Sequence, residues 1–331
     1  MAKYDVYGVG NALVDNEFEV PESFFTEYNI EKGLMTLVAH EQQEYLANIL
    51  NKAYGVKKQS GGGSAGNTIF ALTHFGGRAF YACKVANDET GDFFLEQLEH
   101  HNIDTSVSDR EGGASGRCLV MISPDAERTM HTFLGVSETL SLDNMDFEAA
   151  GQAKYIYIEG YLVTSPTAKS AIIDLKAFAR ESNIKTALTF SDPAMLEYFK
   201  DDVNDVLGDG VDLLFCNEQE IKLWAGTKKF SDACKAMEQK AEQFAVTRGA
   251  DGAVLYDGDN YITIAGHPVK AIDTNGAGDM FAGAFLFAIT QGKDFETAGD
   301  FASRASSEVV TLFGPRLDAD RHQIIVSEVF T

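Results

Sequence analysis

The sequence predicts an α/β fold in which a mostly parallel central sheet is covered by helices on both faces, with a small β lid added to it. Three observations predict this three-layer α/β/α arrangement. Strand-like apolar runs alternate with helical stretches, one hairpin interrupts the alternation, and 331 residues suffice for a large domain with an elaboration. We find no internal repeat or flexible linker, which disfavours two independent domains.

The first half of the chain begins with a strand and continues with two helical stretches. Residues 4–9 are apolar enough for a central strand of a covered sheet. A glycine turn then leads into a helix that ends at residues 76–77, which are both glycine. The apolar face of this helix consists of Ile69, Phe70, Leu72 and Phe75. Residues 79–87 follow as a strand, and residues 88–103 as an amphipathic helix that begins with acidic residues.

The second half of the chain repeats this pattern. Strand-like segments occur at residues 155–163, 185–192, 211–220 and 244–249, and helical stretches at residues 166–183 and 233–243. The last apolar helix begins near Ala277 and shows an apolar face with Phe281, Phe285 and Ile289. Strands and helices that alternate in this way predict a parallel sheet with helices on both faces.

One stretch breaks the alternation. Residues 116–135 contain two extended runs around a tight turn at residues 123–127, which predicts a β-hairpin. A hairpin among βα units indicates an added lobe, and residues 16–37 are the other candidate for it. We therefore assign residues 1–15, 38–107 and 138–331 to the core, and residues 16–37 and 108–137 to the lid.

Composition restricts the classes of partner. Twenty-seven Lys and Arg against fifty Asp and Glu give a net charge of −23, which repels nucleic acid and anionic membrane surfaces. An anionic ligand must therefore be held by local, oriented groups. The chain has no long apolar run and does not begin like a signal peptide, so we expect a cytoplasmic protein. Its four cysteines show no metal-binding or redox spacing, and we expect reduced thiols.

Two glycine-rich turns near the N-terminus differ in what they indicate. Gly8 and Gly10 resemble half of a dinucleotide fingerprint, but Leu13 stands where the third glycine is required. A dinucleotide oxidoreductase is therefore disfavoured, and no P-loop occurs. Residues 61–67, in contrast, open a helix with four glycines, which fits either close approach of a ligand or a flexible surface loop. Asn67 favours a hydroxyl-rich ligand, because its amide offers both a donor and an acceptor.

The stretch DTNGAGDMFAGAFL, residues 273–286, places small residues in the first turn of a helix. Bare amides at the positive end of the helix dipole form an anion site. Asp279 could also be an ordinary acidic residue in the first turn of a helix, where the helix dipole stabilises it. Bare amides beside a carboxylate, however, suit phosphoryl transfer, in which positioning and charge stabilisation dominate and a base orients the attacking hydroxyl.

This stretch resembles the C-terminal motif of the PfkB or ribokinase-like carbohydrate and nucleoside kinases. Residues 61–94 resemble the N-terminal motif of the same family, residues 215–220 its N-x-x-E element, and residues 246–256 its nucleotide-binding turn. The resemblance covers nearly the whole chain and implies a ribokinase-like fold. Within the family, residues 8–20 and 30–46 look most like the adenosine-kinase-like branch.

The resemblance implies roles for particular residues. Asp279 would be the catalytic base, and the anion hole would consist of Asn275, Gly276, Ala277 and Gly278. The ATP-binding residues would be Thr247, Arg248, Gly249, Gly252, Asp273 and Thr274, and Arg128 on the hairpin would reach the phosphates when the lid closes. Asn217 and Glu220 would hold Mg²⁺ through water, although the pair also fits a simple helix start after a strand. The resemblance leaves open whether a monovalent cation such as K⁺ is a further cofactor.

The same resemblance implies a substrate that carries hydroxyls. The residues that would hold them are Asn11, Asp15, Gly62, Gly63 and Asn67, and lid closure would exclude water. An apolar slot for a base, or else lid core, would consist of Leu34, Met35, Leu37, Val120 and Phe133. We expect 5′-phosphorylation of a ribonucleoside such as adenosine. A kinase that acts on free ribose, fructose or ketodeoxygluconate is the alternative function. A non-catalytic regulator that binds nucleosides is a third hypothesis. For the oligomeric state, the resemblance is compatible with both a monomer and a homodimer.

Overall fold

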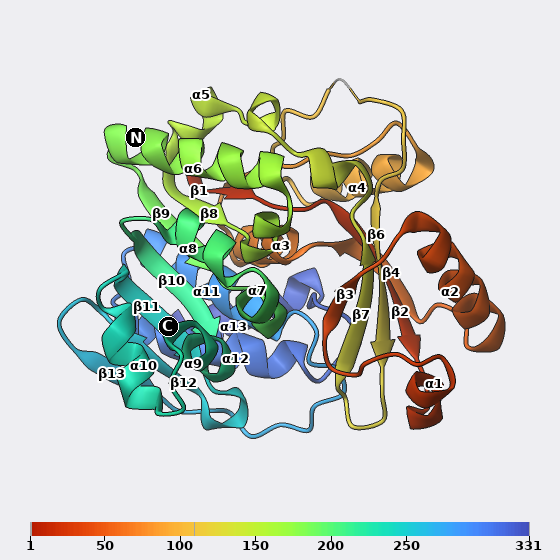
Figure 1. The fold of residues 1–331 in the computed structure, drawn as a ribbon. Coiled ribbons are helices and arrows are strands. Elements are labelled where there is room, and N and C mark those ends of the chain that lie inside the picture. The colour runs from red at the N-terminus through yellow and green to blue at the C-terminus, as the bar shows by residue number, and fades with distance from the viewer. Residues whose placement is uncertain (1, 109, 331) are drawn as a thin grey trace.

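A computed structural model describes residues 2–108 and 110–330 and contains two β-sheets (Figure 1). The large sheet has eight strands in the order β13 (Tyr261–Ile264), β12 (Ala253–Tyr256), β11 (Ala241–Thr247), β10 (Val211–Asn217), β9 (Lys185–Thr189), β8 (Ala153–Ile158), β1 (Tyr4–Val9) and β5 (Ala79–Ala82). The strands from β11 to β5 are parallel, whereas β12 and β13 are antiparallel to their neighbours. The carboxyl ends of the parallel strands therefore meet at one edge.

Helices cover both faces of the large sheet. One face is covered by α3 (Ser64–Phe75), α4 (Glu89–His100), α11 (Ala277–Thr290), α12 (Phe295–Val309) and α13 (Ala319–Phe330). The other is covered by α5 (Phe147–Ala150), α6 (Pro166–Glu181), α7 (Pro193–Tyr198), α8 (Lys200–Leu207), α9 (Glu218–Ala225) and α10 (Phe230–Met237). On β8, Tyr155 and Tyr157 pack toward the first layer and Ile156 and Ile158 toward the second. The predicted three-layer α/β/α fold is confirmed.

The small sheet has five strands in the order β3 (Met35–Leu37), β7 (Arg128–Phe133), β6 (Gly116–Ile122), β2 (Leu13–Glu19) and β4 (Lys58–Gly62). In Figure 1 it stands beside the large sheet, with α1 (Glu22–Glu27) and α2 (His40–Ala53) on its far side. Phe18, Phe24 and Leu50 fill the apolar layer between these helices and the strands. The sheet also includes residues 13–15 and 58–62, which the sequence-based division places in the core.

Several element boundaries differ from those expected. The hairpin at residues 116–135 is present as β6 and β7. The helix expected at residues 233–243 is wrong beyond Met237, because Ala241 begins β11 and its alternate side chains Phe244 and Val246 are buried in the sheet. The strand expected at residues 155–163 ends at Ile158, and a 3₁₀ turn follows at Gly160–Thr164.

Other 3₁₀ turns occur at Gly135–Thr139, Leu142–Asn144 and Gly249–Asp251. All four cysteines are buried and unpaired within the described residues. None of the helices in residues 2–108 and 110–330 combines the length and the apolar character that crossing a bilayer requires.

Candidate active site

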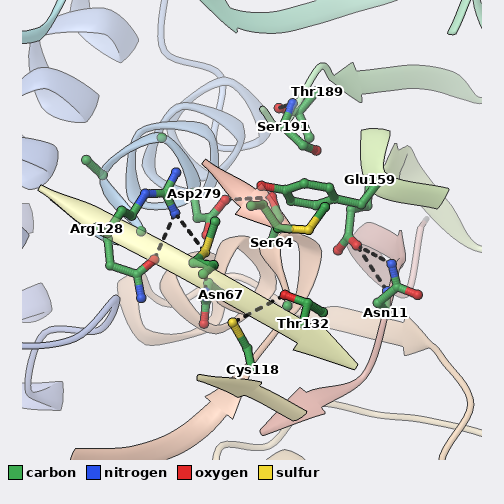
Figure 2. Close-up of a pocket in the computed structure, with 18 of the residues that line it drawn as sticks. Asn11, Ser64, Asn67, Cys118, Arg128, Thr132, Glu159, Thr189, Ser191 and Asp279 are labelled. Carbon is green, nitrogen blue, oxygen red and sulfur yellow. Dashed lines mark hydrogen bonds between the residues drawn. The ribbon is translucent and has the colours of Figure 1, made fainter. Parts of the chain in front are cut away.

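A cavity of about 340 Å³ lies between the carboxyl edge of the large sheet and the inner face of the small sheet (Figure 2). Most of the residues singled out in the sequence line it. These are Asn11, Asp15, Gly63, Asn67, Arg128, Asn217, Glu220, Thr247, Gly249, Thr274, Asn275, Gly276, Ala277, Gly278 and Asp279. Four others, namely Gly62, Arg248, Gly252 and Asp273, do not line it. The topology thus gathers residues from six distant segments at one place.

The N-terminus of α11 opens directly into this cavity. Its N-cap is Gly276, in the left-handed conformation with φ 72°, and no side chain caps the helix. A Cβ at Gly276 would lie 2.3 Å from Cβ of Pro315, so the position accepts no side chain. A Cβ at Gly278, in contrast, would meet nothing within 4 Å. The first amides of the helix are therefore uncovered and face the cavity.

Asp279 is held by two donors from α3. Ser64 Oγ donates to its Oδ1 at 2.7 Å, and Asn67 Nδ2 donates to its Oδ2 at 3.1 Å. Figure 2 shows these three side chains converging on one point. Burial raises the pKa of Asp279, while the hydrogen bonds from Ser64 and Asn67 and the charge of Arg128 oppose the rise. The carboxylate is thus fixed in orientation, with lone pairs left for a ligand.

Asp273 has a different place from the one expected. It is fully buried, and its two oxygens accept from the backbone N–H groups of Asn275 and Gly314, each at 2.8 Å. Both carboxylate oxygens are therefore used to close the turn before α11 against the turn that contains Pro315. Asp273 thus supports the N-terminal turn of α11 from behind and does not face into the cavity.

Asn275 and Arg128 meet at the rim of the cavity. Arg128 Nη1 on β7 donates to Asn275 Oδ1 at 2.9 Å, so the small sheet touches the N-terminal turn of α11. Asn275 is buried, and no described residue accepts a hydrogen bond from its Nδ2. An amide donor and a guanidinium thus stand beside the bare helix amides, which is a fitting donor set for a phosphate.

Asp15 lies on β2 at the opposite end of the polar region. Its carboxylate covers Gly62, where an added Cβ would come within 2.2 Å of it, and this explains the glycine although Gly62 itself does not reach the cavity. No described residue donates a hydrogen bond to this carboxylate. Burial raises the pKa of Asp15 to about 7, although the charge of Arg316 opposes the rise. An unpaired acceptor therefore points into the cavity.

Asn217 and Glu220 form a capping box at the start of α9. Asn217 Oδ1 accepts from the Glu220 amide, and the Glu220 carboxylate accepts from both nitrogens of Asn217, all at 2.8 Å. The simple helix-start interpretation therefore applies, yet both residues also line the cavity. Burial raises the pKa of Glu220 to about 7. Within the described residues, no group of three or more His, Cys, Asp or Glu side chains converges as a metal site.

Two further ATP candidates and part of the apolar slot lie elsewhere. Arg248 pairs with Glu218 at 2.7 Å, and Gly252 has a φ of 83° in the turn before β12. Met35 and Leu37 line the cavity, whereas Leu34, Val120 and Phe133 do not. The ring of Phe133 lies on the other face of β7, against His40 of α2.

The sequence analysis missed two buried charged residues of the site. Glu159, after β8, accepts from Asn11 Nδ2 at 2.9 Å and from the Ala65 amide at 2.8 Å, so it ties three segments together. Arg316, after α12, donates from Nε to Asn67 Oδ1 at 3.0 Å. Neither belongs to a glycine-rich motif. An acid inside the strand-like segment predicted at residues 155–163 was the one available sign of Glu159, and the sequence held no comparable sign for Arg316.

The comparisons with known proteins agree with this geometry. Residues 34–321 match the model of the pfkB family carbohydrate kinases. The fold superposes on a probable sugar kinase from Rhizobium etli with a TM-score of 0.94 at 30% identity, and on adenosine kinase from Sinorhizobium meliloti with 0.93 at 31%. Both alignments cover 99% of each chain. Adenosine kinase from Saccharomyces cerevisiae is 25% identical over 95% of this chain and 96% of its own.

The family match spans most of the chain, and the two similar structures cover all but a few residues. Family membership implies use of ATP with a divalent metal. The chain belongs to the pfkB family of carbohydrate kinases and is a phosphotransferase that acts on an alcohol group.

Proposed function

We propose that the protein transfers the γ-phosphate of ATP to the primary hydroxyl of a ribonucleoside, of which adenosine is the first to test. The observation that carries this proposal is the division of the cavity into a polar end and an apolar wall. The polar end contains Asp15, Asn67 and Asp279. The wall consists of Leu13, Met35, Leu37, Cys118, Met130 and Leu134, all from the small sheet or next to it.

The apolar wall favours a nucleoside over a free sugar. A free sugar carries hydroxyls around its whole rim, and each one buried without a partner costs about 1–3 kcal/mol. Thr132 lines the cavity beside this wall and carries a hydroxyl, but that hydroxyl already donates to Cys118 Sγ at 3.4 Å. A flat, largely apolar base fits such a surface, and the ribose then faces the polar end.

The ribose hydroxyls have suitable partners there. The Asp15 carboxylate, which no described residue pairs, accepts from two neighbouring hydroxyls. Asn11 lies nearby, fixed by Glu159, and Gly63 leaves the backbone open because its φ of 83° and the Asn11 carbonyl 2.1 Å from an added Cβ exclude a side chain. This clamp leaves the primary hydroxyl directed toward Asp279.

Asp279 is the proposed base. It accepts the hydroxyl proton while the oxygen attacks the γ-phosphorus and the bond to the departing ADP oxygen breaks. The amides of residues 276–279 and the unpaired Asn275 Nδ2 stabilise the charge on the transferred group. Arg128 adds a positive charge, and the small sheet that carries it acts as the lid that excludes water.

The residues present fit a magnesium ion that is held through water. Glu220 retains lone pairs beyond its capping contacts and lines the cavity with Asn217, as hard oxygen donors that suit this ion. When bound, the ion would neutralise phosphate charge, and most of its other ligands would be water and phosphate oxygens. Thr247, Gly249 and Thr274 are the predicted ATP residues that remain next to this region.

A free-sugar kinase stays the second candidate, because the similarity to the probable sugar kinase is nearly the same as that to the adenosine kinase. ADP release with Mg-ATP decides between them, with adenosine, inosine, guanosine, ribose, fructose and ketodeoxygluconate as acceptors. Turnover of a sugar, and of no nucleoside, would overturn the proposal. Asp279→Asn serves as the matched variant: we expect retained binding of both substrates and nearly complete loss of turnover, since the amide cannot take a proton.

A further inference from the structure

We infer that Arg316 is a positioning residue for the reaction. It fixes the side-chain amide of Asn67, and through that amide the carboxylate of Asp279. The inference rests on the proposed role of Asp279 as the base. Arg316 lies outside every motif of the sequence, in the turn between α12 and α13, and it does not line the cavity.

Arg316 is held rigidly although it is charged. It is 8% exposed, which is rare for arginine, and its guanidinium carbon lies 4.4 Å from the centroid of the Phe70 ring. Its Nε donates to Asn67 Oδ1 at 3.0 Å. Asn67 and Phe70 are three residues apart on α3 and so share one face of that helix. The guanidinium is thereby fixed by two contacts with a single rigid element.

The contact decides which way the Asn67 amide points. A guanidinium has donors only, so the atom of Asn67 that faces it must be the oxygen. Nδ2 then faces the other way and donates to Asp279. Without Arg316, the Asp279 carboxylate would be the one described side-chain partner left to orient the amide, which would then be held at one end instead of two. One of the two donors that orient the base would be less firmly placed.

Arg316 also places a positive charge behind the site. Burial lowers the pKa of Arg316 to about 10, so the side chain remains charged at neutral pH. Burial raises the pKa of both Asp15 and Asp279, and the charge of Arg316 opposes both rises. A base must be deprotonated to act. Removal of this charge therefore shifts the acid limb of the kcat profile to higher pH.

A double-mutant cycle on kcat tests this inference. Arg316→Met, Asn67→Ala and the double variant are compared at saturating Mg-ATP and adenosine, with thermal melting to verify folding. We expect Arg316→Met to lower kcat about 10- to 100-fold, as a misplaced catalytic group does, with the KM for ATP unchanged. In the Asn67→Ala background the same change should cost less than about 2-fold, because the contact is already absent.

Two further variants separate positioning from general structure. Arg321→Met removes a nearby arginine, which pairs with Glu308, and should leave kcat and its pH profile unchanged. Arg316→Lys restores the charge without the planar fork, so the acid limb should return toward that of the wild type while kcat stays low. Arg316→Lys also carries the test if Arg316→Met does not fold.

Additive losses in the cycle, or an acid limb that does not move in Arg316→Met, would overturn the role of Arg316 and leave the proposed function intact. If the wild-type protein phosphorylates none of the nucleosides in the substrate panel, the proposed function fails instead. The same cycle is then measured on the acceptor that the substrate panel identifies, because the contacts from Arg316 through Asn67 position the base and not the acceptor.

Discussion

Replacement of Gly278 by alanine should separate stability from turnover in this protein. Gly278 is the second residue of α11, has helical backbone, and is exposed to the cavity. A Cβ built there meets no atom within 4 Å. The methyl group is therefore accommodated without strain by the protein, but it occupies the space in front of the helix amides.

The expected magnitudes follow from this geometry. Alanine is favoured over glycine in a helix by roughly 0.5–1 kcal/mol, chiefly because it restricts the unfolded chain. For a chain of this length we expect a Tm increase on the order of 1–2 °C. The methyl group should at the same time displace a phosphate oxygen from one amide donor, and loss of one such donor costs about 10²- to 10³-fold in kcat.

The assay pairs thermal melting without substrates with steady-state turnover of the best acceptor. Gly112→Ala is the matched control, because a Cβ at Gly112 also meets nothing within 4 Å but Gly112 does not line the cavity. It should leave kcat unchanged. Turnover of Gly278→Ala within about 3-fold of the wild type would refute the need for bare amides. A large fall in Tm would refute the placement of Gly278 in open space.

Three other outcomes are expected. Gly276→Ala should destabilise the fold by about 1–3 kcal/mol in denaturant unfolding, because it combines a φ of 72° with a contact of 2.3 Å to Pro315; an unchanged midpoint would contradict this. Glu17 is fully buried, its carboxylate has no hydrogen-bond partner among the described residues, and burial raises its pKa to about 8 from an ordinary 4.5. The folded state thus holds a proton that the unfolded state releases, so stability falls as pH rises from about 4.5 to 8. The advantage of Glu17→Gln in free energy of unfolding, measured by denaturant unfolding, should grow over that window by a few kcal/mol at about 1.4 kcal/mol per pKa unit; a constant difference would count against it. For Asp15, whose pKa is raised to about 7, kcat/KM for the acceptor should rise with pH and level off above 7, and a flat profile between pH 5 and 8 would exclude Asp15 as a charged clamp.

The sequence predicted the fold well where each element carries its own pattern. The alternation of apolar runs and helices predicted the covered parallel sheet, and the turn residues predicted the β6–β7 hairpin. The sequence predicted the secondary structure less well where hydrogen bonding to a neighbouring strand determines it. Residues 241–243 continue a helical pattern, and only hydrogen bonding to β10 makes them a strand. Likewise, β4 contains glycines that disfavour a strand, and its pairing with β2 decides its structure.

The site shows the same division. Residues in glycine-rich motifs could be found from the sequence, because uncovered backbone leaves a visible pattern. Glu159 and Arg316 could not be assigned, since each acts through a partner more than 90 residues away. Asp273 belongs to a motif, yet its motif does not show that its oxygens face Gly314 and not the cavity. Which side of a turn a carboxylate faces is a property of packing.

The contact between Gly276 and Pro315 links two positions that lie far apart in the chain. An added Cβ at residue 276 would meet not only the proline ring but also the backbone Cα of residue 315 at 2.5 Å and its carbonyl oxygen at 2.9 Å. We therefore expect every substitution at residue 276 to be destabilising, both in the native background and when residue 315 is first changed to glycine. The variation that this kinase tolerates at the start of α11 is thus limited by the backbone of a turn that does not line the cavity.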